Sequence, residues 1–255
     1  MSWSVRQTEL ALATLMVLVT PSKAVTRASL PEIVKEIQRS ICPVGVIRTD
    51  LSGKNHFVIE GTGFFVGAEG RFVTALHVAR AVQDAIETQP LQRAAVCVPY
   101  DGWPRGDETA PLWCAGFKII NSDAQNDLAL CLTERNPFAD PKTKHFVHPA
   151  VLDATLPPDG TEVIFIGFPS SNAVPMTFRG FVSSYQDIAR GKESGPLFLI
   201  QGSDLPGMSG GPLCLPNGHV IGLVLGSGTQ RFATLTGARP TRFISSLLKG
   251  PKTGY

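Results

Sequence analysis

Short apolar segments separated by glycine, proline and charged residues recur along most of the chain, and each is long enough for a β-strand. In the first half these segments span 42–47, 55–66, 71–76, 112–120 and 128–132. In the second half they span 161–168, 177–184, 197–201, 213–215, 220–225 and 232–235. Many short strands with turn residues between them predict an all-β barrel or sandwich.

Three segments have the apolar spacing of an amphipathic helix. Residues 30–39 follow Ser29, a suitable N-cap residue, and carry Pro31 in the first turn. Residues 78–86 are apolar with helical spacing for about two turns. Residues 241–249 place Phe243, Ile244, Leu247 and Leu248 on one face, which predicts a closing C-terminal helix.

Composition agrees with a folded protein that has a sizeable core. The 255 residues are 43% hydrophobic and 17% charged, and they include 25 glycines and 20 prolines, which suits a turn-rich β fold. A formal net charge of +2, with no clustered basic stripe and no RNA-binding aromatic motif, gives no reason to expect nucleic acid as a partner.

The first 24 residues differ from the rest. Arg6 precedes the apolar run 10–19, which is too short for a bilayer span of about 20 residues but fits the core of a signal peptide. Ser22 and Ala24 are small residues at the right spacing for cleavage after Ala24. We therefore expect export to the periplasm or the exterior, with no stable membrane span after removal of the leader. The alternative is a buried or amphipathic N-terminal segment.

Five cysteines are present, an odd number, so at least one is free or pairs with another chain. Cys131 and Cys214 lie in apolar runs and are expected to be buried thiols. Cys97 and Cys114 flank a long loop, and their pairing in an oxidising compartment is the less favoured alternative. No CxxC motif occurs, and His145 and His148 have no further clustered ligand, so we expect no metal site and no cofactor.

The most informative stretch is Gly207-Met208-Ser209-Gly210-Gly211-Pro212. A serine becomes nucleophilic when a histidine takes its proton and a carboxylate orients that histidine. His77 follows the segment 71–76, and Asp127 precedes the apolar strand 128–132. Asp123 is the competing carboxylate, but it lies in a more polar stretch. An α/β-hydrolase would need a helix after the serine and a later catalytic histidine, and this chain offers neither in a suitable context.

The motifs GTGFFV, RFVTALHV, NDLALCL and GMSGGPL resemble those of the trypsin-like, chymotrypsin-fold serine peptidases, nearest the HtrA branch and its single-domain bacterial relatives without a PDZ domain. The chain order His, Asp, Ser matches that fold. The resemblance implies two six-stranded antiparallel β-barrels. We expect a leader over 1–24, a helical segment over 25–40 and a first barrel over 41–140. A linker, the second barrel and the closing helix are expected to follow over 141–255.

The resemblance also implies roles for residues. Ser209 would be the nucleophile, His77 the general base and Asp127 the carboxylate that orients it. The backbone N–H groups of Gly207 and Ser209 would form the oxyanion hole.

Substrate-binding positions follow from the same resemblance. Ser203 would lie at the base of the primary pocket, which favours small or medium apolar side chains. A shift of one residue would place Asp204 there and favour basic ones. Gly226, Ser227 and Gly228 would pair with the substrate backbone.

We therefore predict a serine endopeptidase that hydrolyses protein or peptide substrates through an acyl-enzyme. Two alternatives stay open: a catalytically latent binding protein on the peptidase fold, and an esterase-like hydrolase on the same fold. The loop 99–111 is either a surface excursion or a segment that contacts substrate or regulates the site.

Overall fold

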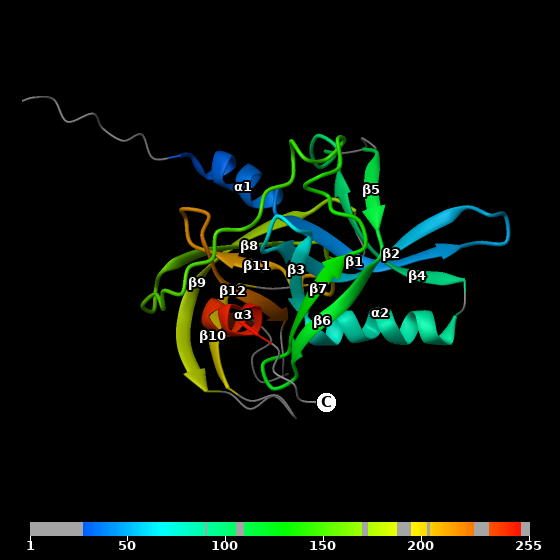
Figure 1. Cartoon of the computed structure of the whole chain (residues 1–255). Helices are drawn as coiled ribbons and strands as arrows, with labels where there is room; N and C mark the ends of the chain where they lie inside the picture. Colours follow the sequence, from blue (N-terminus) through cyan, green and yellow to red (C-terminus); the bar gives the residue numbers. More distant parts are fainter. Residues whose placement is uncertain are drawn as a thin grey trace, which may run out of the picture.

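The computed structural model describes residues 28–89, 91–105, 110–169, 173–187, 195–202, 205–226 and 235–250. The predicted leader over 1–24 lies outside these ranges. The described elements form two β-sheets with three helices around them (Figure 1). This is the chymotrypsin-like two-barrel fold that the sequence predicts.

The first sheet has seven strands in the order β5-β4-β1-β2-β3-β7-β6. Its strands are β1 (Ile41–Thr49), β2 (Asn55–Phe65), β3 (Arg71–Ala75), β4 (Gln92–Pro99), β5 (Leu112–Ala115), β6 (Phe117–Asp123) and β7 (Leu128–Thr133). Only Gly116 separates β5 from β6, yet these two strands are the opposite edges of the sheet. The sheet must therefore curl until its edges come near each other, as an incompletely closed barrel.

The second sheet is a closed barrel of six strands in the order β10-β13-β12-β11-β8-β9. Its strands are β8 (Glu162–Gly167), β9 (Met176–Asp187), β10 (Pro196–Gln201), β11 (Pro212–Cys214), β12 (Val220–Gly226) and β13 (Leu235–Pro240). This barrel has the predicted number of strands, whereas the first sheet has one strand more than predicted. The sequence pattern predicts one strand over 112–120 where the structure has two, β5 and β6, and it predicts no strand at β4, which pairs with β5.

The three helices are α1 (Leu30–Gln38), α2 (Leu76–Thr88) and α3 (Thr241–Leu248). At the start of α1, the Ser29 N–H donates to the Glu32 carboxylate at 2.7 Å, which satisfies one end of a capping box. Helix α3 packs against strands of both sheets, and the Asn121 side chain of β6 donates to the carbonyl of Leu247. None of the described helices is long and apolar enough to cross a membrane.

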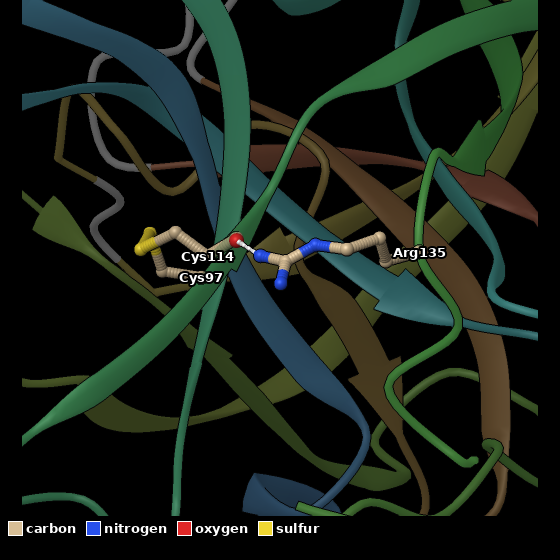
Figure 2. The surroundings of a disulfide bond; sticks show 3 residues. All are labelled: Cys97, Cys114 and Arg135. Carbon is tan, nitrogen blue, oxygen red and sulfur yellow. Dashed lines mark hydrogen bonds between the residues drawn. A yellow bond between two sulfur atoms is a disulfide. The ribbon is translucent and has the colours of Figure 1, made fainter. Parts of the chain in front are cut away.

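Cys97 and Cys114 form a disulfide between β4 and β5 (Figure 2). From the sequence this pairing is the less favoured alternative, but the structure contains it. The antiparallel register places the two cysteines directly opposite each other, with their Cα atoms 4.2 Å apart, which the sequence spacing does not reveal. Arg135 donates to the carbonyl of Cys114 and ties the chain beyond β7 to the edge strand β5.

The other three cysteines, Cys42, Cys131 and Cys214, are buried free thiols. Burial raises the pKa of each of these thiols above its ordinary value. They behave as small apolar side chains of the core.

The connection from the first sheet to the second is held against α1. Arg39 donates to the carbonyls of Phe146 at 2.7 Å and His145 at 2.8 Å. His145 pairs with Asp101, and His148 pairs with Glu36. The two histidines thus have separate carboxylate partners, and no group of three or more potential metal ligands occurs among the described residues.

Candidate active site

His77 is the second residue of helix α2. The sequence predicts a strand through residue 76 with the histidine at its end, but β3 ends at Ala75 and the helix begins at Leu76. The first N–H groups of a helix have no partner within it. Here Asp127 supplies both partners, because its carbonyl accepts from the Leu76 N–H at 3.0 Å and its Oδ1 accepts from the His77 N–H at 2.9 Å.

The second carboxylate oxygen of Asp127 lies 2.6 Å from Nδ1 of His77. An ionised carboxylate only accepts hydrogen bonds, so Nδ1 carries the hydrogen and Nε2 is the basic nitrogen of the neutral ring. The Asp127 side chain is 4% exposed, whereas the His77 side chain is 46% exposed. The arrangement is a buried carboxylate hydrogen-bonded to a half-exposed imidazole.

Asp127 lies in the turn between β6 and β7 with a φ of 54°, the only positive φ among the described non-glycine residues. The competing carboxylate Asp123 does not contact His77. It accepts from the backbone N–H and the side-chain amide of Asn126, at 3.2 and 2.8 Å. Asp123 therefore stabilises the turn that carries Asp127.

The segment around Ser209 packs directly against the first sheet. A Cβ at Gly210 would lie 1.9 Å from the carbonyl oxygen of Thr62, and a Cβ at Gly61 would lie 2.9 Å from that of Ser209. The same Cβ at Gly61 would meet the side chain of Val78, the residue after His77, at 2.6 Å. Glycine at these places lets the two backbones approach, which brings Ser209 to the beginning of α2.

The backbone N–H groups around Ser209 fall into two sets. The N–H of Met208 donates to the carbonyl of Leu205 at 3.0 Å, and that of Gly210 donates to Val224 at 2.7 Å. The N–H groups of Gly207 and Ser209 make no hydrogen bond within the part of the chain that the structure describes. The free N–H groups of Gly207 and Ser209 therefore lie on either side of the bonded N–H of Met208 along the chain.

The Ser209 hydroxyl donates to the carbonyl of Leu225 at 3.3 Å. His77 Nε2 and Ser209 Oγ make no hydrogen bond to each other in this conformation. The structure thus brings His77, Asp127 and Ser209 to the junction of the two sheets, with His77 and Asp127 bonded and the serine side chain turned toward β12.

Of the predicted substrate-binding residues, the structure describes only Gly226. It is the last residue of β12, has a φ of 92° and follows Leu225, the acceptor of the Ser209 hydroxyl. Ser203, Ser227 and Gly228 lie outside the described residues, as does Asp204. In the loop 99–111, Trp103 donates to the carbonyl of Gln38 and packs edge-on against Phe168, with ring centroids 4.8 Å apart.

Sequence reasoning missed one residue of this site, Thr62. It is buried between the two sheets and bonds to the segment that carries Ser209. The available signal was a polar residue between two glycines, in Gly61-Thr62-Gly63, directly before the apolar pair Phe64-Phe65.

The model of the trypsin-like peptidase domain matches residues 61–223, which is more than half of the chain. The chain belongs to the trypsin-like peptidase family. The match contains His77, Asp127 and Ser209. None of the curated proteins compared with the chain matches it.

Solved structures of several proteases share the fold of this trypsin-like peptidase. The active form of the Rv3671c protease from M. tuberculosis is 17% identical, with a TM-score of 0.59 over 98% of this chain and 96% of that one. Deg5 is 21% identical, with a TM-score of 0.60 over 86% and 93%. The HtrA-type protease AlgW, solved with a decapeptide, is 16% identical, with a TM-score of 0.66 over 87% and 68%.

Proposed function

We propose that this chain is a serine endopeptidase that hydrolyses peptide bonds through an acyl-enzyme. The observation that carries the proposal is the pair of unbonded N–H groups at Gly207 and Ser209, beside the Ser209 hydroxyl and across the junction from the bonded His77–Asp127 pair. Preorganised donors of this kind stabilise the negative charge that develops on a carbonyl oxygen during acyl transfer.

In the proposed reaction, Ser209 Oγ attacks the carbonyl carbon of the scissile bond while His77 Nε2 takes its proton. The carbonyl oxygen becomes an oxyanion that accepts from the N–H groups of Gly207 and Ser209. His77 then gives the proton to the leaving amine as the C–N bond breaks, which leaves an ester on Ser209. Water attacks this ester with His77 again as base, and the acid product and free serine are released. Asp127 keeps Nδ1 protonated and stabilises the imidazolium in both steps.

The proposed reaction requires a different position of the Ser209 hydroxyl. The Ser209 hydroxyl must leave the carbonyl of Leu225 and point to His77. Its present bond of 3.3 Å is longer than the usual range of about 2.5–3.0 Å for O–H···O bonds, so little stabilisation is lost. Catalytic hydrogen bonds are often long or absent before substrate binds.

The hydrogen bond of the Ser209 hydroxyl to Leu225 also favours one alternative, a latent protein whose site becomes active only in response to a signal. Among the structural neighbours, the Rv3671c protease has been solved in both an active and an inactive form. Latency and constitutive activity differ in whether the purified protein reacts without an activator.

The proposed substrates are proteins or peptides, since the family is one of peptidases and AlgW was solved with a decapeptide. We further propose that the protein is exported and that Ser203, Gly226, Ser227 and Gly228 contact the substrate. We also propose that the primary pocket prefers small or medium apolar side chains of the substrate. A peptide library with all side chains at the position before the cut tests it directly.

The decisive experiment is intact-mass analysis after exposure of the protein to a fluorophosphonate. The wild type is expected to gain one adduct, and Ser209→Ala none. Ser40→Ala is the matched control, because Ser40 is a buried serine whose hydroxyl donates to the carbonyl of Ile37, away from the site. This control should label like the wild type.

Turnover assays then separate the alternatives. Labelling with cleavage of peptides supports the endopeptidase, and labelling with turnover of activated esters alone supports the esterase-like hydrolase. A folded wild type without an adduct would favour the latent binding protein.

A further inference from the structure

Thr62 occupies an unusual place between the two sheets. It lies on β2, its side chain is fully buried, and its partner on the neighbouring strand β1 is Pro43. Proline has no N–H to donate. The carbonyl of Thr62 instead accepts from the hydroxyl of Thr74 on β3, at 2.6 Å.

The other polar groups of Thr62 all bond to the second half of the chain. Its N–H donates to the carbonyl of Ser209 at 2.8 Å, and its hydroxyl donates to the carbonyl of Gly207 at 2.7 Å. The same hydroxyl oxygen accepts from the N–H of Phe168 at 3.0 Å. A single side chain thus joins the first sheet, the segment after β8 and the turn that carries Ser209.

The hydrogen bond from the Thr62 hydroxyl to the Gly207 carbonyl holds one peptide unit of the turn in place. The peptide unit between Gly207 and Met208 has its carbonyl held by Thr62 and its N–H held by the carbonyl of Leu205. The two free N–H groups belong to the peptide units on either side of it. Fixing the central peptide at both ends restricts the backbone rotations that could turn these donors away from a common point.

We propose that Thr62 is a positioning residue for the oxyanion hole, which acts through the carbonyl of Gly207 to keep the N–H groups of Gly207 and Ser209 convergent. The inference rests on the proposed peptidase function and concerns a residue that does not touch the reacting atoms. Without the hydroxyl, both the Gly207 carbonyl and the Phe168 N–H lose a buried partner, and the turn gains freedom to reorient.

The test compares Thr62→Ser with Thr62→Ala, which differ only in the hydroxyl oxygen. Removing one oxyanion donor outright costs about 10²- to 10³-fold in kcat. For a donor that is present but less well held, we expect a smaller loss, so Thr62→Ala should have a kcat roughly 10- to 100-fold below that of Thr62→Ser. KM should change by less than about threefold, because the lost interaction acts in the transition state.

A second readout is inhibition by a peptide aldehyde, whose carbonyl carbon bonds to Ser209 and whose oxygen occupies the oxyanion hole. Its Ki should rise by the same factor as kcat falls. Thr143→Ala is the matched control, since Thr143 is also fully buried and its hydroxyl donates to a carbonyl, that of Pro137, at 2.6 Å. This variant should lose stability without losing kcat in its folded form.

Equal kcat values for folded Thr62→Ser and Thr62→Ala, with an active wild type, would overturn the role of Thr62 and leave the proposed function intact. The same holds for a change confined to KM. A wild type that neither reacts with a fluorophosphonate nor cleaves peptides would overturn the proposed function and this inference with it. If Thr62→Ala does not fold, Thr62→Val, which retains the volume of the side chain, replaces it in the comparison.

Discussion

The two sheets hold their parts of the candidate site in different ways. The first sheet and helix α2 supply Asp127 and His77, and both carboxylate oxygens of Asp127 accept hydrogen bonds, one from the backbone N–H and one from the ring of His77. The second barrel supplies Ser209, whose backbone is fixed by close packing at Gly210 while its hydroxyl has one long bond to Leu225. The His77 ring thus has a short hydrogen bond that fixes its orientation, whereas the Ser209 hydroxyl has only a long one.

The sheets also differ in how they close. The second is a closed barrel, and its free cysteine, Cys214, is buried. The first stays open between its edge strands, and the Cys97–Cys114 disulfide lies at the edge pair of β4 and β5. Substitutions at the proposed site and at the edge of the first sheet should therefore give different results, the first on kcat and the second on stability.

The largest effect is expected from Asp127→Asn. The amide has one acceptor oxygen where the carboxylate has two, so it cannot accept from both the backbone and Nδ1 of His77, and its NH₂ group favours the wrong tautomer of the ring. In a comparable triad the same change lowers kcat about 10⁴-fold, and we expect a loss of that order here. The measurement is kcat for a peptide substrate found by library cleavage.

Asp123→Asn is the control for this change. Asp123 is also buried but contacts Asn126 and not His77, so its replacement should lower stability and reduce kcat by less than about tenfold. Equal losses of kcat in the two variants would contradict the assignment of Asp127 as the orienting carboxylate.

Local sequence patterns predict some parts of the two sheets and not others. His77, Asp127 and Ser209 were predicted from local motifs; in the structure His77 is hydrogen-bonded to Asp127, and the backbone of Ser209 is hydrogen-bonded to Thr62 of β2. Strand β4 was missed, because Gln92–Pro99 has little alternation of buried and exposed positions. The predicted strand before His77 ran one residue too far, through Leu76, because the start of α2 is fixed by Asp127, 50 positions beyond His77.

The features that escaped prediction share one physical cause. The Cys97–Cys114 disulfide depends on the register between two strands, and the hydrogen bonds of Thr62 depend on contacts between two sheets. Neither is encoded in local periodicity or turn chemistry. Glycine spacing around Ser209 predicts a sharp turn, but the partner backbone that makes Gly210 necessary belongs to β2.

The next effect in size is expected from Gly207→Ala, which disturbs the second-barrel half of the site. Gly207 has a φ of 98°, and a Cβ there would lie 2.3 Å from the carbonyl oxygen of Phe168. The turn must shift, and the donor N–H groups shift with it. We expect kcat to fall by about 10²- to 10³-fold, the cost of losing one oxyanion donor.

Gly160→Ala separates backbone strain from the clash. Gly160 has a similar φ of 83°, but a Cβ there would meet nothing within 4 Å. It should lower the free energy of unfolding by roughly 1–2 kcal/mol, the cost of a left-handed non-glycine residue, and leave kcat unchanged. A Gly207→Ala enzyme with normal kcat would show that the oxyanion donors lie elsewhere.

The smallest effect on the site is expected from the double variant Cys97→Ala/Cys114→Ala, which breaks the first sheet at its edge. The disulfide joins residues 17 positions apart. A closed loop of this length stabilises a protein by about 3 kcal/mol, chiefly through the unfolded chain. We expect the free energy of unfolding in urea to fall by about that amount, while kcat of the folded enzyme stays within about twofold, because the two cysteines lie on β4 and β5 and neither takes part in the hydrogen bonds of His77 or the Ser209 hydroxyl.

Counting thiols tests the premise of this prediction. In the native protein the three free cysteines are buried and their pKa values are raised, so iodoacetamide should modify none of them. In denaturant without reductant it should modify three residues, Cys42, Cys131 and Cys214, and after reduction all five. Five adducts before reduction would show that Cys97 and Cys114 are not paired, and the first sheet would then be held at its edge by hydrogen bonds and packing alone.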